Sequence, residues 1–438
     1  MRIIENSDSY SEMLPDLKQA RFGSYLIFPF QFEEGDDRTD WADQTFIPRD
    51  VTTVDINDIA RSMMSRTGQM SIGSCWLIPQ NVLLREMTDG LLGQPPSFFI
   101  DTGAASRRFS LTDSWLYVFH THVAFLAIGV VFDEIQTLAD MINPGGVDSR
   151  AVFRYEDGSG HHTFSMEDWI GTLSEKVGLH RLFSSRNNPF LDVFTYTLAV
   201  VPKRFPDIDV MKQAAFNLHL MIPFGNPITD NSEEDVRFVY ARIGEESQTY
   251  RWATCITSQS VSYLVADLGM DLVTQMQTRA RAGLPVVMLA LYEKYTCLHY
   301  TEVIATTDLQ HLKRIEKLKM EMLKFQAYGT IAPANLSRWH NIRQIYSALL
   351  ETNDIPAAIS DVDHKINILS EHQRELESQR SELLMNLITA FGIVSILASV
   401  LSIIDILHGG EHAIWISLIL TVLIMVFAFL LAFSRRKR

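Results

Sequence analysis

The stretch "INILSEHQRELESQRSELLMNLITAFGIVSILASVLSII", residues 366–404, decides the fold that we predict for this chain. Apolar side chains recur in alternating steps of four and three, the heptad spacing of a helix that packs along one seam. No proline or glycine interrupts Leu376–Leu383, where a charged half meets an apolar half. We therefore predict one continuous helix, whose seam is Val362, Ile366, Leu369, Gln373, Leu376, Arg380, Leu383, Leu387, Ala390, Val394, Leu397, Leu401 and Ile404.

A seam of this length requires partner helices. The sequence contains one such helix per chain, so its partners are most simply copies of the same chain around a symmetry axis. Gln373 and Arg380 occupy seam positions. A buried arginine is costly in a dry coiled coil but not beside a water-filled axis, so we place both residues at a stalk axis. Glu377 and Glu382 are near enough in sequence to balance the Arg380 charge.

Two apolar runs near the end of the sequence predict membrane spans. Residues 383–404 and 413–433 are each long enough, at roughly 20 residues, to cross a bilayer as a helix. Between them, residues 405–412 form a short external loop that contains "HGGEH" (His408–His412). This matches the H-x-x-E-H pattern of a class of zinc peptidase. Its two glycines disfavour the helix that such a site needs, so we interpret it as the tip of a transmembrane hairpin.

Composition agrees with a large soluble region that carries a small membrane anchor. The chain has 438 residues, a net charge of −14 and a mean hydropathy of +0.04. The first residues have no apolar core typical of a signal peptide, and residues 434–438 form a basic tail. The positive-inside rule then predicts an inner-membrane protein with two crossings and both termini in the cytoplasm. The three cysteines are widely spaced, as in a reducing compartment, and the acidic body disfavours nucleic-acid partners.

Residues 1–306 mix strand and helix patterns and predict a cytosolic α/β domain. Residues 307–356 predict a helical hairpin, with helices from Asp308 to Gly329 and from Asn335 to Glu351. Residues 357–382 are then the cytosolic stalk. Pro285 is well placed in the first turn of a further helix. The predicted strands are residues 24–32, two strands within 114–132 around "HTH", and residues 193–201, 217–222, 236–243 and 263–267.

Two details of this α/β region carry specific expectations. Pro29 lacks a backbone N–H and should confine the first strand to a sheet edge or a bulge. The segment "DEIQTLADMIN" (residues 133–143) has apolar residues at helical spacing and ends before a Pro-Gly-Gly run, so it predicts a short helix.

Polar residues within the first span suggest a pore wall. Five of them are candidates to line it. Ser395, Ser399 and Ser402 form a stripe of small residues with Gly392 beside the seam, whereas Asn386 and Thr389 point to a different side, and one of these two groups would be the pore wall. Small polar residues at this spacing equally allow close packing against the second span, and both interpretations stay open for the serines. Asn386, an amide inside an apolar run, favours the pore. Asp405 and Glu411 would form acidic rings at the external mouth of an oligomer, or anchor the helix ends at the membrane interface.

This layout resembles the CorA metal-ion transporter superfamily. The resemblance rests on a cytosolic α/β domain, a helical hairpin, a long stalk helix continuing into the first of two C-terminal spans, a short loop and a basic tail. It implies a homopentameric, funnel-shaped cation channel whose stalk helices line the axis. The family carries Gly-Met-Asn at the outer end of the first span, where this chain has "DILHGG" (residues 405–410). The family's magnesium filter therefore does not carry over.

Divergent CorA-like proteins without that filter are associated with type III CRISPR systems. The segments "LYVFHTHVAFLAIGVVFDEIQTLADMIN" and "PVVMLALYEKYTCLHYTEV" look like the strand pair, helix and apolar pre-stalk helix of that subgroup. The resemblance implies an antiviral defence channel opened by a nucleotide second messenger.

A nucleotide-like ligand needs cationic or amide donors for phosphate and an aromatic surface for the base. Two short segments offer such groups: Arg186, Asn187 and Asn188 in one, and Tyr250, Arg251 and Trp252 in the other. Either segment equally well provides surface polarity beside core aromatics. His120 and His122 stand close together, but without neighbouring carboxylates they do not predict a metal site. No nucleophile elbow, P-loop or paired carboxylates stand out, so an enzyme is not expected.

Three hypotheses follow from the sequence. The first is an oligomeric CorA-like channel gated by a ligand on its cytosolic domain. The second is a divalent-cation transporter with an altered filter, for which Mg²⁺ or a similar ion is the permeant or regulatory species. The third is a membrane-anchored scaffold that conducts nothing. No cofactor is required by any of them.

Overall fold

The computed structural model describes residues 19–407, apart from residues 34–38, 52, 54, 67–69, 93–95, 104, 144–150, 159, 182–192, 227–235, 244–249, 267, 268, 270 and 307–311. Residues 10, 12–14, 415, 419 and 422 are described as well. The chain divides into two compact units. The first comprises residues 1–307 and 317–364, and the second comprises residues 308–316 and 365–438.

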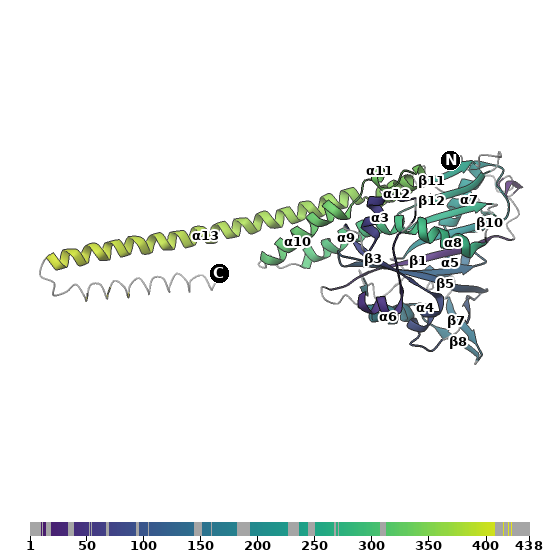
Figure 1. Ribbon diagram of the computed structural model, residues 1–438, viewed down its shortest axis with the longest axis horizontal. Coiled ribbons are helices and arrows are strands. Elements are labelled where there is room, and N and C mark those ends of the chain that lie inside the picture. Colours follow the sequence, from purple (N-terminus) through teal and green to yellow (C-terminus); the bar gives the residue numbers. More distant parts are fainter. Residues whose placement is uncertain are drawn as a thin grey trace. The chain divides into compact units, whose positions relative to one another are not determined.

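A mixed β-sheet forms the centre of the first unit (Figure 1). Within the described residues its main path runs β11 (Val239–Ile243), β12 (Tyr250–Ile256), β13 (Ser260–Ala266), β10 (Phe194–Val201), β1 (Arg21–Gln31), β6 (Val123–Phe132), β5 (Ser106–Phe119), β4 (Ser97–Asp101), β7 (Val152–Asp157) and β8 (Gly160–Phe164). Off this path, β3 (Gly73–Ile78) pairs with β5, β2 (Ile47–Arg49) with β3, and β9 (His180–Arg181) with β1. β10 and β13 are parallel, and the other described pairs are antiparallel.

The predicted strand pair around "HTH" is confirmed as the β5–β6 hairpin. His122 lies in the turn with a left-handed φ of 64°. The pairing shifts register between Thr112 and Trp115, because Asp113 and Ser114 together stand opposite one residue of β6. This is a β-bulge, which bends a strand and re-aims its side chains.

The edge or bulge expected at Pro29 is wrong, because β1 lies inside the sheet. β1 pairs with β6 along one side and with β10 and β9 along the other. The pairing with β10 ends at Ile27 and the pairing with β9 begins at Phe30. Pro29 stands at this break and pairs with Phe125 of β6. A residue without an N–H is tolerated there because the ladder on one side is already interrupted.

Helices cover the sheet of the first unit: α2 (Thr39–Thr45), α3 (Asp58–Met64), α4 (Gln80–Met87), α5 (Gln136–Ile142), α6 (Met166–Val177), α7 (Ile208–His219), α8 (Leu272–Ala282) and α9 (Leu284–Thr306). The short helix expected within residues 133–143 is confirmed as α5. Pro285 lies in the first turn of α9, as predicted.

The strand predicted at residues 217–222 is wrong, because its first three residues complete α7. Asp207 caps the start of this helix, accepting hydrogen bonds from the backbone N–H groups of Asp209 and Val210 at 2.7 and 3.0 Å. At its other end the buried Asn217 amide donates to the carbonyl oxygens of Phe224 and Asn226, at 3.1 and 2.8 Å. A short apolar run does not by itself distinguish a strand from a buried helix, and here the tertiary contacts decide.

Three further segments precede the long helix: α10 (Leu312–Lys324), which continues into a π-helical turn at Phe325–Gly329, α11 (Pro333–Leu336) and α12 (His340–Thr352). The predicted end of a helix at Gly329 is confirmed, and the helix expected from Asn335 begins later, at His340. α12 packs on α9, where the Tyr346 hydroxyl donates a hydrogen bond to Glu293. Residues 317–364 thus belong to the same unit as the sheet.

The predicted continuous helix is confirmed as α13 (Ile355–Leu407), an unbroken helix of 53 residues. At the usual rise it is about 80 Å long. It crosses from the charged half of the sequence into the apolar half without a break at the junction of the predicted stalk and span. Its first ten residues belong to the first unit and the remainder to the second.

Candidate functional site

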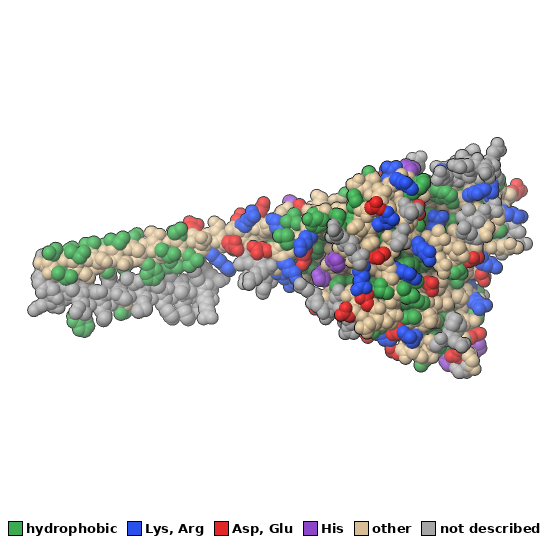
Figure 2. All heavy atoms as spheres, in the orientation of Figure 1, with side chains coloured by type: hydrophobic (Ala, Val, Ile, Leu, Met, Phe, Trp, Pro, Cys, Tyr) green, Lys and Arg blue, Asp and Glu red, His purple; other side chains and the backbone are tan. Residues whose placement is uncertain are grey.

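The apolar half of α13 is long and apolar enough to cross a membrane, and within the described residues it is the one helix with this property. Its most apolar window has no buried residue. Large side chains such as Leu384, Ile388 and Ile396 are 61, 66 and 66% exposed. Figure 2 shows these hydrophobic side chains along the surface of the helix. A helix of this composition needs a cover of lipid or of other helices.

The candidate pore residues on α13 differ in how their polar groups are satisfied. The Thr389 hydroxyl donates to the Met385 carbonyl and the Ser399 hydroxyl to the Ser395 carbonyl, each at 2.8 Å. These hydroxyls are satisfied by their own helix, so they suit a lipid-facing, packed or pore-facing position equally. The Asn386 amide is exposed and makes no hydrogen bond within the described part of the chain. It is the polar group of the span that most needs water or another chain.

The other residues that the sequence suggested for the pore, the stalk axis and the external mouth differ in their exposure. Ser395 is exposed and Ser402 is half-buried. Gln373 is buried, at 6% exposure, whereas Arg380 is exposed. The Asp405 side chain and Glu411 lie outside the described residues, as do the tail and nearly all of the second predicted span.

The two segments suggested for ligand binding are described only in part. Arg186, Asn187 and Asn188 lie outside the described residues, as does the Tyr250 side chain. Arg251 and Trp252 are successive residues of β12, so their side chains leave the strand on opposite faces. Trp252 packs against the main hydrophobic core.

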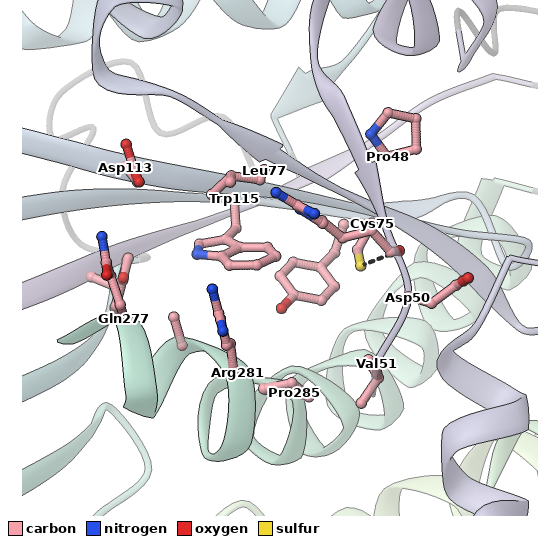
Figure 3. A pocket seen from close by; sticks show the side chains of 14 residues that line it. Pro48, Asp50, Val51, Cys75, Leu77, Asp113, Trp115, Gln277, Arg281 and Pro285 are labelled. Atoms are coloured by element: carbon pink, nitrogen blue, oxygen red, sulfur yellow. Dashed lines mark hydrogen bonds between the residues drawn. The ribbon is translucent and has the colours of Figure 1, made fainter. Parts of the chain in front are cut away.

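A different group of side chains surrounds a pocket of about 440 Å³ in the first unit (Figure 3). This volume is within the range of roughly 300–1,000 Å³ that is usual for small-molecule sites. The pocket lies between the sheet strands β1, β2, β3 and β5 and the helices α8 and α9. Its lining is Tyr25, Pro48, Arg49, Asp50, Val51, Cys75, Leu77, Asp113, Trp115, Tyr117, Gln277, Ala280, Arg281 and Pro285.

Two arginines reach this pocket from different elements, Arg49 from β2 and Arg281 from the last turn of α8. Figure 3 shows Arg281 extending from the helix toward Trp115 on the opposite wall. Within the described residues neither guanidinium has a hydrogen-bond or ion-pair partner. α8 packs on β1, and its Met276 Sδ lies 2.2 Å from the position that a Cβ at Gly23 would take.

The aromatic wall of the pocket depends on the bulge in β5. Before the bulge, the odd-numbered Phe109 and Leu111 face the main hydrophobic core, whereas after it the even-numbered Leu116 and Val118 do. This change of parity turns Trp115 and Tyr117 toward the pocket instead of the core. Their rings are stacked, with centroids 6.4 Å apart and an interplanar angle of 30°.

Both carboxylates of the pocket already have partners. Asp113 Oδ1 accepts a hydrogen bond from the Gln80 backbone N–H at 3.3 Å, at the start of α4. Asp50 Oδ1 accepts from the Arg66 backbone N–H at 3.0 Å, and Figure 3 shows its carboxylate directed away from Arg281. These backbone hydrogen bonds do not cancel the carboxylate charges, so the lining holds two positive and two negative side chains, and within the described residues no ion pair joins Arg49 or Arg281 to either aspartate.

The Cys75 thiol and the Tyr25 and Tyr117 phenols of the pocket are buried. Burial raises the pKa of the Cys75 thiol to about 12, so it is not a nucleophile at neutral pH. Its Sγ lies 3.1 Å from the Arg49 carbonyl oxygen and ties β2 to β3. Burial also raises the pKa of the Tyr25 phenol, and the nearby Trp115 indole N–H opposes that shift.

The two histidines noted in the sequence are not joined by a set of metal ligands. Within the described residues no group of three or more His, Cys, Asp or Glu side chains is placed to hold a metal ion. His122 instead lies beside His299, with ring centroids 6.0 Å apart. Burial, together with His122, lowers the pKa of His299 to about 4. His299 Nδ1 is 3.1 Å from Gln31 Oε1, and the amide satisfies the neutral ring.

The described structure thus defines a protein with a mixed α/β domain and a long C-terminal helix apolar enough to cross a membrane. No family model, curated protein or solved structure matches the chain.

Proposed function

We propose that this chain is the subunit of an oligomeric, CorA-like inner-membrane channel, gated by a small ligand that binds its cytosolic α/β unit. The observation that carries the proposal is α13 itself. It is one unbroken helix whose first part belongs to the α/β unit and whose last part exposes large apolar side chains. Such a helix transmits a rotation or shift at one end to the other end, because it contains no hinge.

The proposed assembly is a homopentamer, with α13 around the axis and the second span, residues 413–433, on the outside. The exposed apolar surface of α13 supports this arrangement, because a single membrane helix with a heptad seam is satisfied by copies of itself. The Asn386 amide then faces the axis, where water or an ion satisfies it. The resemblance to filter-less CorA-like proteins of type III CRISPR systems makes a nucleotide second messenger the expected ligand.

A route from the α/β unit to α13 exists within the first unit. α8 and α9 form one wall of the pocket, and α9 stacks on the sheet through Phe119 and Tyr292, whose centroids are 4.5 Å apart. Glu293, the next residue of α9, accepts the hydrogen bond from Tyr346 of α12. α12 is followed directly by α13. In the proposed mechanism the ligand binds the open arrangement of these helices more tightly and shifts the population toward it.

The proposal is tested by ion flux into liposomes that contain the purified full-length protein. Adenosine-based second messengers are added with Mg²⁺ held constant, and Mg²⁺ is then varied without them. Flux that requires the nucleotide supports the gated channel. Magnesium flux controlled by internal Mg²⁺ alone would replace it with the transporter hypothesis.

Absence of flux in every condition would refute conduction and favour a membrane-anchored scaffold. Empty liposomes and liposomes with heat-denatured protein serve as controls for leakage.

A further inference from the structure

We infer that the pocket between β1, β2, β3, β5 and α8 binds a small organic phosphate that carries a flat aromatic group, such as a nucleotide. This binding site adds a ligand site to the proposed function. Only its consequence, the gating of the channel, rests on the proposed function. Binding of the ligand to the pocket is measurable separately from ion flux.

The phosphate end of the site is formed by Arg49 and Arg281. Guanidinium groups form paired, charge-assisted hydrogen bonds to phosphate oxygens, and here neither has a partner within the described residues. Both side chains are exposed, and they line the same cavity from different elements. A phosphate bound in this cavity would therefore meet two guanidinium groups.

The aromatic end of the site is the Trp115 ring. The bulge turns it out of the core, Tyr117 supports one side of it, and the pocket lies beside it (Figure 3). Its indole N–H is buried beside the Tyr25 phenol and forms no well-aligned hydrogen bond within the described residues. A base that stacks on such a ring contributes on the order of 1–3 kcal/mol.

The acidic residues favour a nucleotide over a simple anion. Asp113 has one oxygen engaged with the Gln80 N–H, and its second oxygen accepts further hydrogen bonds. A carboxylate in the cavity repels inorganic and organic phosphates alike, but it accepts a hydrogen bond from a ribose hydroxyl or an exocyclic amino group, which an inorganic phosphate lacks. Gln277 adds an amide that both donates and accepts. The pocket therefore matches a ligand with one anionic end and one neutral, hydrogen-bonding aromatic end.

The inference is tested by calorimetric binding measurements on the full-length protein in detergent. The probes are AMP, ATP, adenosine and inorganic pyrophosphate. We expect AMP or ATP to bind, and the Arg49→Ala and Arg281→Ala variants each to weaken that binding by at least about tenfold. Trp115→Ala should weaken nucleotide binding by a similar factor, with less effect on pyrophosphate. Arg85→Ala removes an exposed arginine of α4 outside the pocket and should leave binding unchanged.

The other outcomes would refute the site, the nucleotide assignment or the proposed gating. If neither AMP nor ATP binds at about 1 mM, or if the arginine variants bind them normally, the site is refuted. If pyrophosphate binds as tightly as the nucleotides and Trp115→Ala has no effect, the pocket is an inorganic anion site and the nucleotide assignment is wrong. Nucleotide binding that depends on both arginines, in a protein whose flux never responds, would preserve the site and refute the proposed gating.

Discussion

At the residue scale, Glu293 is a buried carboxyl group between two helices. It is 3% exposed on α9, and the Tyr346 hydroxyl of α12 donates a hydrogen bond to it. Burial raises its pKa to about 8, while the hydrogen bond from Tyr346 opposes the shift. The carboxyl group is therefore largely protonated at neutral pH, and it holds α9 and α12 together without a buried charge.

This pKa shift predicts a loss of stability as the pH rises. The folded-state pKa is above the unfolded value, so the folded protein binds more protons between about pH 4.5 and pH 8. The stabilising contribution is complete below that window and is lost as the pH rises through it. Glu293→Gln keeps a neutral hydrogen-bonding side chain. As the pH rises, the wild type loses this contribution and the variant does not. We therefore expect the free energy of unfolding of the variant to rise relative to that of the wild type by on the order of a few kcal/mol.

Thermal unfolding of both proteins in detergent at about pH 5.5 and pH 8 measures this effect. The exposed Glu175 of α6 provides the matched control, because Glu175→Gln should leave the pH dependence unchanged. If the difference in unfolding temperature between Glu293→Gln and the wild type were the same at both pH values, the assignment of a raised pKa to Glu293 would be wrong.

Asn386 is the second residue with a specific consequence. If its amide faces the axis of an oligomer, Asn386→Leu removes a polar group that replaces water around a permeating ion. We expect flux in liposomes to fall by about tenfold, which is about 1.4 kcal/mol in the barrier. Ile388→Leu, at an exposed position on the other side of α13, should leave flux unchanged. Normal flux through Asn386→Leu would exclude this residue from the pore wall.

At the element scale, the bulge of β5 links strand geometry to the pocket. Gly129 of β6 lies opposite it, and a Cβ at this position would lie 2.5 Å from the Asp113 carbonyl oxygen. Ser114 Oγ fixes the same point by accepting a hydrogen bond from the Gly129 N–H at 3.0 Å. The neighbouring backbone of β5 therefore leaves no room for the methyl group of an alanine at position 129.

Gly129→Ala should therefore destabilise the protein by about 1–3 kcal/mol, as overpacking does, and weaken nucleotide binding by moving Trp115. Thermal unfolding and calorimetry measure the two effects. Gly171→Ala on α6 is the control, because its new methyl group meets no atom within 4 Å. If Gly129→Ala matched the control in both measurements, the bulge would not be what positions the aromatic wall.

At the scale of the whole molecule, the proposed oligomer brings equivalent seam residues of α13 together. Leu376→Cys should form disulfide-linked dimers in oxidised membranes, whereas Ser378→Cys, on the opposite face of the helix, should not. The native Cys75, Cys255 and Cys297 are buried and do not compete. The native mass of the purified protein measures the number of subunits directly. A monomeric mass, or equal cross-linking at both positions, would refute the assembly.

Local patterns in the sequence predicted the elements whose own residues determine them. The residues of the β5–β6 hairpin, α5 and α13 themselves carry strand or helix signals, so the type of these elements was evident before their packing. Pro29 and Asn217 were misjudged because their local signals are ambiguous. Pro29 is tolerated because the ladder of β1 is broken there. Asn217 belongs to a helix end that is held by contacts with residues 223–226.

The sequence by itself therefore determined a mixed α/β domain followed by a long helix that passes from a charged half to an apolar half. Periodicity is a local property, and it is sufficient for such a helix. Only the tertiary structure revealed the pocket, because Arg49, Trp115 and Arg281 are far apart in the sequence and no spacing relates them. They meet because a bulge reverses the faces of β5 and because α8 packs on β1, and both effects depend on contacts between distant segments.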